Sequence, residues 1–196
     1  MTETPKKDAW NILYGNSPRA WRGVSSVPDT GISGRVLDAG CGNGKTSAAL
    51  AEKGFEVYGI DFSEKAVEYC RKNYGNNFEV SDCTSVPFPD SFFGGVFAVH
   101  LTEHLDDGEI SVFASECMRI LCPGGRVFVR SFSPGDMRDD GREFRNGIYY
   151  RYRTSEEIVS AFEGFDTVFS KTKREKTRFG KTRVISECLF SKPITE

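Results

Sequence analysis

The 196-residue sequence has no long hydrophobic run and no excess of charge of either sign. No apolar stretch reaches the roughly 18 residues that a membrane-spanning helix needs. No apolar segment follows the two lysines near the N-terminus, so a secretory signal is not expected. With 26 basic against 28 acidic residues, the chain as a whole is not a strongly basic nucleic-acid binder. We therefore expect a cytoplasmic protein without a membrane partner.

Histidines and closely spaced cysteines are also scarce. No two of the six cysteines have the C-x-x-C spacing typical of zinc or redox sites. The two histidines, His100 and His104, have no paired cysteines nearby. The sequence therefore predicts no metal site and six free thiols, most of them buried as small apolar residues.

The chain divides into two parts. Residues 1–30 hold both tryptophans and three prolines, which predicts an N-terminal arm with a short helix near Lys7–Tyr14. Residues 31–196 form one predicted domain of alternating strands and helices. Strands are expected at 35–39, 55–60, 77–81, 95–100 and 126–132, helices at 46–53, 63–74, 107–121 and 154–162, and a turn at 123–125.

Strands that alternate with helices predict a parallel sheet covered on both faces. The last third of the chain breaks the pattern with two strand-like runs, 166–174 and 183–190, joined through Arg178–Lys181. These runs predict an antiparallel hairpin added to the sheet edge. The expected fold is therefore a doubly wound, mainly parallel α/β sheet of Rossmann-like type with a C-terminal antiparallel hairpin.

A glycine-rich turn follows the first predicted strand, where doubly wound sheets bind their ligands. The dinucleotide fingerprint G-x-G-x-x-G does not fit, because the glycines stand at 40, 42 and 44. Gly44-Lys45-Thr46 matches the end of a phosphate-binding loop, but Ala39 replaces its first glycine. The fourth strand also lacks the terminal aspartate that would hold magnesium.

The stretch 36–44, Val-Leu-Asp-Ala-Gly-Cys-Gly-Asn-Gly, instead resembles the first motif of class I S-adenosylmethionine-dependent methyltransferases. The resemblance covers about 35–132 and includes Asp61, the pair Asp82-Cys83 and the run 119–126, in the family's order. It implies a seven-stranded sheet, S-adenosyl-L-methionine as cofactor, and methyl transfer as the activity.

Each part of this cofactor needs a different partner. Asp61 lies 23 residues after Asp38, which suits a carboxylate that accepts both ribose hydroxyls. The resemblance implies that Asp82 and Cys83 bind the adenine and that Asp38 holds the glycine loop or the cofactor's amine. The predicted cofactor-binding residues are Asp38, Gly40, Cys41, Gly42, Gly44, Asp61, Phe62, Asp82, Cys83, His100, Tyr14 and Arg22.

The N-terminal arm has two interpretations. Its pattern of Trp10, Tyr14, Pro18 and Trp21 resembles the arm that closes over the cofactor in small-molecule and thiol methyltransferases. Tyr14, Arg19 and Arg22 would then be donors for the methionine carboxylate. The alternative is that both tryptophans only attach the arm to the sheet.

Residues after the fourth strand are expected beside the transferred methyl group. His104, His100 and Glu103 stand there and are the candidate catalytic residues, with neutral His104 as a base. The Asn/Asp-Pro-Pro-aromatic tetrad of amine methylation is absent, and so is a Pro-Cys nucleophile. A small-molecule acceptor is therefore favoured.

Two further regions bear on the acceptor. The segment 133–153 is too long for a plain connection, and its arginines and tyrosines indicate a wall for an anionic or planar acceptor. Residues Lys171–Arg183 hold seven basic side chains against Glu175 alone. This run is either a phosphate-binding edge for RNA or an anionic substrate, or a solvated hairpin.

The leading hypothesis is a methyltransferase acting on a small molecule as a monomer or homodimer. The alternatives are an RNA or protein methyltransferase, a catalytically silent partner subunit that binds the cofactor, and a phosphate-loop nucleotide hydrolase.

Overall fold

The computed structural model describes residues 6–18 and 26–194. Within these ranges, seven strands form one sheet in the order β3-β2-β1-β4-β5-β9-β8. Strands β1 to β5 pair in parallel, whereas β9 runs antiparallel to both β5 and β8. The expected doubly wound sheet with a C-terminal antiparallel hairpin is confirmed. The strands span Arg35–Ala39 (β1), Glu56–Asp61 (β2), Phe78–Val80 (β3), Phe93–Val99 (β4), Leu121–Phe132 (β5), Asp166–Lys176 (β8) and Thr182–Ser191 (β9).

The helices begin where the sequence supplies side chains that cap them. Ser63 accepts a hydrogen bond from the backbone N–H of Ala66, and Thr154 forms a capping box with Glu157. Such caps satisfy backbone donors that the first helical turn leaves unpaired. The helices span Lys6–Asn16 (α1), Lys45–Glu52 (α2), Glu64–Tyr74 (α3), Asp107–Ile120 (α4) and Ser155–Ala161 (α5), with a 3-10 turn at Thr102–His104 (η1).

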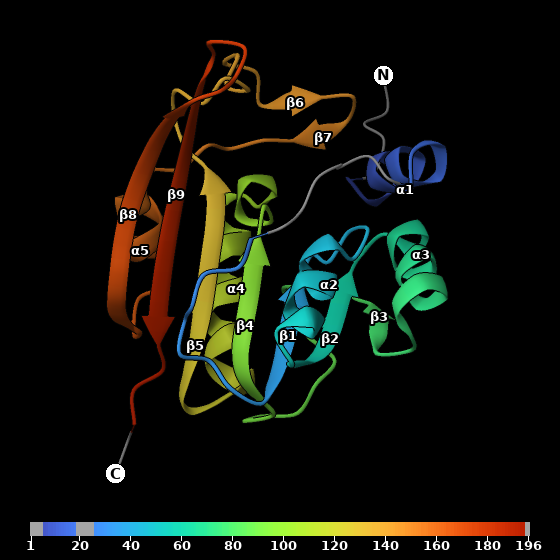
Figure 1. Cartoon of the computed structure of the whole chain (residues 1–196), viewed down its shortest axis with the longest axis vertical. Helices are drawn as coiled ribbons and strands as arrows, with labels where there is room; N and C mark the ends of the chain where they lie inside the picture. Colours follow the sequence, from blue (N-terminus) through green and yellow to red (C-terminus); the bar gives the residue numbers. More distant parts are fainter. Residues whose placement is uncertain (1–5, 19–25, 195–196) are drawn as a thin grey trace.

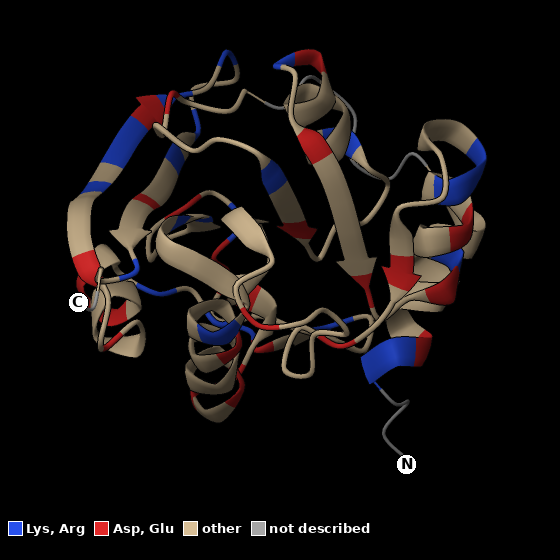
Figure 2. Ribbon diagram, turned by 90° about the horizontal axis from the view of Figure 1, so that it is seen from below, with Lys and Arg blue, Asp and Glu red and all other residues tan. Residues whose placement is uncertain are grey.

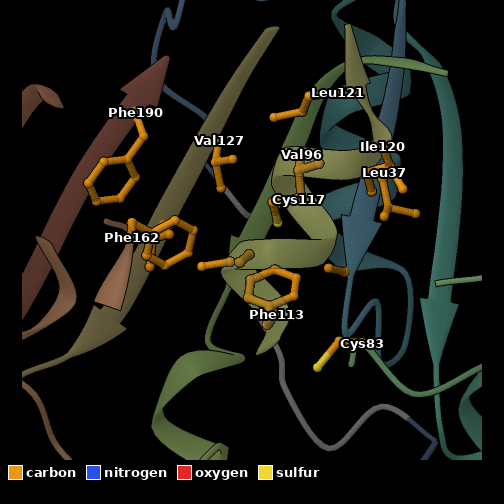
Figure 3. Close-up of a cluster of buried hydrophobic side chains, with 14 of the residues drawn as sticks. Leu37, Cys83, Val96, Phe113, Cys117, Ile120, Leu121, Val127, Phe162 and Phe190 are labelled. Atoms are coloured by element: carbon orange, nitrogen blue, oxygen red, sulfur yellow. The ribbon is translucent and has the colours of Figure 1, made fainter. Parts of the chain in front are cut away.

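The central strands bury side chains on both faces of the sheet, since consecutive residues of a strand point to opposite sides. Leu37 belongs to the large cluster under α4 and α5, whereas its neighbour Val36 belongs to a second cluster with Leu50 of α2. Figure 3 shows Phe113 and Cys117 of α4 beside Leu37 and Val127 of the sheet. This two-sided burial makes the sheet a rigid support for the loops at its ends.

The expected turn at 123–125 lies inside strand β5. Phe93 pairs with Leu121 and Gly95 with Arg126, so the register shifts between these two pairs. Gly124 has a φ of +74°, and Pro123 has no N–H to donate to the sheet. The turn residues therefore form an irregularity within a longer strand instead of a separate connection.

The segment 133–153 contains a small hairpin that the sequence analysis does not predict. Strand β6 (Phe144–Arg145) pairs antiparallel with β7 (Ile148–Tyr149). Asn146 and Gly147 between them have φ values of +52° and +76°. An Asn-Gly pair with two positive φ angles is the favoured two-residue hairpin turn. This dipeptide is the signal in the sequence that would have identified the hairpin.

Helix α1 and the β6–β7 hairpin lie above the end of the sheet toward which β4 and β5 point (Figure 1). Trp10 and Tyr14 of α1 form a small apolar cluster with Ala66 of α3 and Ile148 of β7. The predicted helix in the arm is confirmed. It lies over the carboxyl ends of the parallel strands, where a ligand site is expected.

All six cysteines are free thiols, and five of them are buried. No group of three His, Cys, Asp or Glu side chains arranged to hold a metal ion occurs among residues 6–18 and 26–194. None of the described helices has the length and apolar character needed to cross a membrane.

Candidate active site

A cavity of about 810 Å³ lies at the carboxyl ends of the parallel strands. Its size falls within the range of about 300–1,000 Å³ that is usual for small-molecule sites. Helix α1, the loops after β1, β2 and β4, the segment 138–150, and strands β5, β8 and β9 line it. The cavity therefore brings together regions that are far apart in the sequence.

The glycine loop forms one wall of the cavity. Gly40, Gly42 and Gly44 have φ values of +67°, +52° and +74°, which favour glycine. A Cβ atom at Gly42 would overlap the Tyr14 hydroxyl group of helix α1. A side chain at position 42 would therefore have to displace Tyr14.

Asp61 joins the glycine loop to the end of β2. Its Oδ2 accepts a hydrogen bond from the Gly42 N–H at 2.9 Å, and its Oδ1 accepts one from the Ser63 N–H at 2.9 Å. Burial raises the pKa of Asp61 to about 6, although these two bonds lower it. Each carboxylate oxygen has a second lone pair, and the side chain lines the cavity. Asp61 can therefore still accept two hydrogen bonds from a ligand.

Asp38 lies behind the loop and is not part of the cavity lining. Its Oδ2 accepts a hydrogen bond from the Ser47 hydroxyl at 2.5 Å, and burial raises its pKa to about 7. Gly44 is likewise not in the lining, and a Cβ atom there would overlap the Tyr74 ring. In this geometry Asp38 supports the loop and α2 from behind.

The other residues predicted to bind the cofactor's adenosine lie on the cavity wall. Asp82 accepts hydrogen bonds from the Thr84 N–H and hydroxyl at its Oδ1, which leaves Oδ2 without a hydrogen bond to any described residue. Cys83 is buried, and burial raises the pKa of its thiol. Phe62 packs beside the apolar cluster of Trp10 and Tyr14. The predicted ribose and adenine residues are thus brought to one surface.

Helix α1 is held over this surface by polar contacts at its first and middle turns. Lys6 forms an ion pair with Glu109 at 2.6 Å, and the Asn11 Oδ1 accepts a hydrogen bond from the Ser63 hydroxyl at 2.8 Å. Tyr14 lines the cavity, as predicted. Arg19, Trp21 and Arg22, by contrast, lie outside the described residues.

The three candidate catalytic residues meet after β4. The His100 Nδ1 donates to the Glu103 Oε1 at 2.9 Å, and the Ser131 hydroxyl donates to the Oε2 at 2.9 Å. His100 has a φ of +60°, an uncommon conformation for a residue with a side chain. Burial raises the pKa of Glu103, but the charge and hydrogen bond of His100 outweigh burial and hold that pKa below its usual value.

Of the two ring nitrogens of His104, Nδ1 has a hydrogen-bond partner and Nε2 has none among the described residues. Its Nδ1 lies 2.8 Å from the backbone oxygen of Tyr149, which can only accept a hydrogen bond, so the neutral ring carries its proton on Nδ1. The Nε2 then has a lone pair. Burial lowers the pKa of His104 below its usual value, against the opposing charge of Glu103. The neutral base form is therefore favoured at neutral pH.

A buried arginine that the sequence analysis does not identify holds this segment. Arg153 donates to the backbone oxygens of Thr102 at 2.7 Å and Leu105 at 2.9 Å, and to the Asp107 carboxylate at 2.7 Å. Thr102 and Leu105 directly precede and follow Glu103 and His104 in the sequence, so Arg153 fixes the backbone on both sides of them. Nothing in the local sequence marks Arg153, because its partners lie about 50 residues earlier in the chain.

The far side of the cavity is lined by aromatic and basic side chains. Of the residues predicted for this wall, Arg138, Arg145 and Tyr150 line the cavity. Arg142 and Arg151 instead form ion pairs with Asp140 and Asp107 and are not in the lining.

The basic run at 171–183 divides between the surface and the cavity. Blue segments follow one another along the outer strand β8 in Figure 2. Lys171 and Lys173 both form ion pairs with Glu187, at 3.4 and 2.9 Å. Lys173 and Arg183 also line the cavity. Part of the run predicted to bind RNA or an anionic substrate, or to be a solvated hairpin, therefore lies at the cavity.

Comparisons with known proteins agree with this geometry. Residues 37–129 match the methyltransferase domain family. The chain is 35% identical over 132 residues to 2-methyl-6-phytyl-1,4-hydroquinone methyltransferase of Synechocystis, covering 65% of this chain and 40% of that protein. It is 31% identical over 127 residues to demethylmenaquinone methyltransferase of Clavibacter sepedonicus, covering 62% and 51%. The chain thus spans about half or less of the length of these curated relatives.

Solved structures show the same fold. A methyltransferase from Methanosarcina mazei superimposes with a TM-score of 0.70 at 23% identity, covering 82% of this chain and 93% of that one. The 1,6-didemethyltoxoflavin-N1-methyltransferase of Burkholderia thailandensis, solved with S-adenosylhomocysteine, gives a TM-score of 0.63 at 18% identity, covering 98% of this chain and 80% of that one. The matching domain, the motif order and this fold place residues 37–129 among the class I S-adenosylmethionine-dependent methyltransferases.

Proposed function

We propose that this protein transfers a methyl group from S-adenosyl-L-methionine to a small molecule. The observation that carries the proposal is the meeting of the glycine loop, the Asp61 carboxylate and the His104 imidazole at one cavity. The names of the relatives support a small acceptor, because 2-methyl-6-phytyl-1,4-hydroquinone is a small molecule.

The residues around the cavity suit the parts of this cofactor. The spare lone pairs of Asp61 would accept the two ribose hydroxyls, and the open Oδ2 of Asp82 would accept the adenine amine. Gly40 and Gly42 allow the backbone to approach the methionine part closely. Asp38 would act through the loop that it supports. Tyr14 would help to close the site from α1.

When bound, S-adenosyl-L-methionine supplies an electrophilic methyl group on a sulfonium. The chain then has to align the acceptor, exclude water and take a proton where the acceptor has to lose one. Helix α1 covers the cavity and would exclude water. The Nε2 of His104 would remove the acceptor's proton, while Glu103 and Arg153 hold the segment that carries it.

Calorimetry with S-adenosylmethionine, and separately with ATP and magnesium, tests the cofactor. We expect the wild-type protein to bind the first, and Asp61→Asn to weaken that binding by roughly 2–4 kcal/mol, because a charge-assisted pair of hydrogen bonds is lost. Asp166→Asn is the matched control, since Asp166 is exposed at the start of β8. Binding of ATP alone, or an Asp61→Asn protein that folds and binds normally, would refute this assignment.

Incubation of the protein with methyl-labelled S-adenosylmethionine and a cell extract tests the acceptor. We expect label in the fraction of small metabolites. Label that appears only in RNA or protein would support the alternative acceptors, and no label in any fraction would support a silent partner subunit.

A further inference from the structure

Arg138 and Arg183 come together at the far end of the cavity from different parts of the chain. Arg138 lies before the β6–β7 hairpin and Arg183 at the start of β9. Their guanidinium carbons lie 4.4 and 5.4 Å from the centre of the Phe132 ring. Both side chains line the cavity and are about one third exposed, at 32% and 30%.

The charge of these two arginines is only partly neutralised. Asp136 is the acidic side chain closest to both, at 4.0 Å from the Arg138 Nη1 and 3.9 Å from the Arg183 Nε. These separations exceed hydrogen-bond length. The Asp136 oxygens accept instead from the backbone N–H groups of Arg138 at 2.9 Å and Val184 at 2.8 Å. Asp136 offsets one of the two guanidinium charges, which leaves these three side chains with one net positive charge.

Both side chains also have buried hydrogen-bond donors without a partner. The buried Nη1 of Arg138 and Nε of Arg183 have no hydrogen-bond partner among the described residues. A buried donor without a partner is destabilising. Burial, together with the neighbouring charge of Arg183, lowers the pKa of Arg138. The contacts with Phe132 and the ion pairs with Asp136 therefore leave donors of both arginines without a hydrogen-bond partner among the described residues.

Other partly buried arginines of the chain show the contrast. Arg153 donates three hydrogen bonds to two carbonyl groups and one carboxylate. Arg130 donates to the Glu187 carboxylate at 2.9 Å and to the Ser26 backbone oxygen at 2.6 Å. These two have the partners expected of structural arginines, whereas Arg138 and Arg183 face the cavity without such partners.

We propose that Arg138 and Arg183 bind the carboxylate of a small planar acceptor, which makes the methyl acceptor an organic monoanion. Paired guanidiniums match a carboxylate because they can donate parallel hydrogen bonds to its two oxygens. One unneutralised positive charge fits one negative charge. The proposal rests on the proposed methyltransferase function and names the substrate class for that same cavity.

The position of Phe132 defines how the acceptor would lie. His100 stacks on Phe132 with ring centres 4.1 Å apart, so Arg138, at 4.4 Å, has to occupy the opposite face. The carboxylate would therefore be separated from the histidine side of the cavity by the thickness of one ring. Tyr150 and Ile185 supply apolar lining in the cavity. An aromatic carboxylate with a separate hydroxyl or amino group could place its carboxylate at the arginines and its other polar group on the histidine side.

The carboxylate in this arrangement is an anchor and not the atom that is methylated. Its lone pairs would be engaged by two guanidiniums, which makes its oxygens poor nucleophiles. The reacting group would lie at the other end of the acceptor, where the His104 Nε2 is open to take its proton.

Ligand-detected NMR with S-adenosylhomocysteine at saturation tests the proposal. The probes are benzoate, salicylate, 3- and 4-hydroxybenzoate and anthranilate, each paired with its neutral carboxamide, together with phenyl phosphate. We expect at least one acid to bind tenfold or more tightly than its amide, and its affinity to fall as salt is raised. If no acid exceeds its amide, the carboxylate proposal is wrong. Tighter binding of phenyl phosphate than of every acid would likewise overturn it.

Substitutions test whether Arg138 and Arg183 bind the acid. Arg138→Gln and Arg183→Gln should each reduce the affinity of the acid at least tenfold, and the Lys variants should restore part of it. Arg142→Gln is the matched control, because Arg142 pairs with Asp140 away from the cavity. All variants should bind S-adenosylhomocysteine as the wild type does, which also reports that they fold. Unchanged binding of the acid would overturn the proposal, whereas failure of the wild type to bind S-adenosylhomocysteine would instead refute the proposed function.

Discussion

At the residue scale, burial shifts the pKa values of the acidic and basic side chains of the site in opposite directions. Burial raises the pKa of Asp38 to about 7 and that of Asp61 to about 6, because a carboxylate loses its hydration. Burial lowers the pKa of His104 for the same reason, since its charged form is the protonated one. Near neutral pH, His104 is therefore a neutral base, while the carboxyl groups of Asp38 and Asp61 change their charge.

The two histidines allow a direct test of His104. We expect NMR titration to show one imidazole whose pKa lies below 6.5 and whose neutral form carries its proton on Nδ1. That signal should be absent in His104→Gln. The same substitution should lower the turnover rate roughly 100- to 10,000-fold, as expected for loss of a general base. A titration at or above 6.5, or a variant with normal turnover, would contradict the assignment.

Asp38 makes a testable contribution to the pH dependence of stability. Its pKa is raised from 3.8 to about 7, so the folded state holds a proton that the unfolded state has lost. The stabilisation is present below pH 3.8 and is lost as the pH rises to about 7. Asp38→Asn keeps an acceptor for Ser47 without the charge. It should therefore be more stable than the wild type at pH 8, by up to roughly 4 kcal/mol.

Urea unfolding at pH 5 and pH 8 checks this expectation. The stability difference between the two pH values should shrink in Asp38→Asn, while the exposed control Asp166→Asn should behave as the wild type does. An Asp38→Asn protein that loses stability equally at both pH values would indicate that the charge itself is needed for the fold.

At the scale of elements, helix α1 belongs to the site more than to the core. Its buried side chains form a separate cluster with Ala66 and Ile148. The two clusters that cover the faces of the central sheet contain no described residue before Val27. The interactions of α1 with Ser63 and Glu109 lie at the rim of the cavity. The lid interpretation of the arm therefore stays a prediction, beside the alternative that the arm is purely structural.

Deletion of residues 1–24 tests the lid. We expect a folded domain with a slightly lower melting temperature, because the main core is intact. Binding of S-adenosylmethionine should be weakened at least tenfold, since Tyr14 and the cover over Asp61 are lost. Circular dichroism and calorimetry measure both effects. An insoluble fragment would show that α1 is part of the core, and unaltered melting and binding would show that the arm has neither role.

At the scale of the whole molecule, the cavity lies between two regions of different charge. The lining from the first half of the sheet includes the acidic pair Asp61 and Asp82, which suits ribose and adenine donors. The lining from the last third includes Arg138, Arg145 and Arg183, which suits an anion. With the proposed function, one sheet would support a cofactor half and an acceptor half of the cavity.

The sequence alone determined the elements whose signals are local. Short apolar or alternating runs marked the parallel strands, Ser63 marked a helix start, and the spacing of the glycines marked the loop after β1. Because parallel strands end at one edge of the sheet, the motif order also predicted that Asp61, Asp82 and His104 would share a site. The Asn146-Gly147 turn was equally local, but it lay in a segment that had been assigned to a loop.

The tertiary structure alone decided the contacts that depend on packing between distant segments. Tyr14 meets Gly42, Arg153 holds the Thr102–Leu105 turn, and Arg183 joins Arg138 beside Phe132. None of these pairs has a fixed spacing or a periodic pattern, because each forms only when the hairpin and α1 dock on the finished sheet. Local sequence therefore predicted the side of the cavity that we propose for the cofactor, and long-range packing built the wall that we propose for the acceptor.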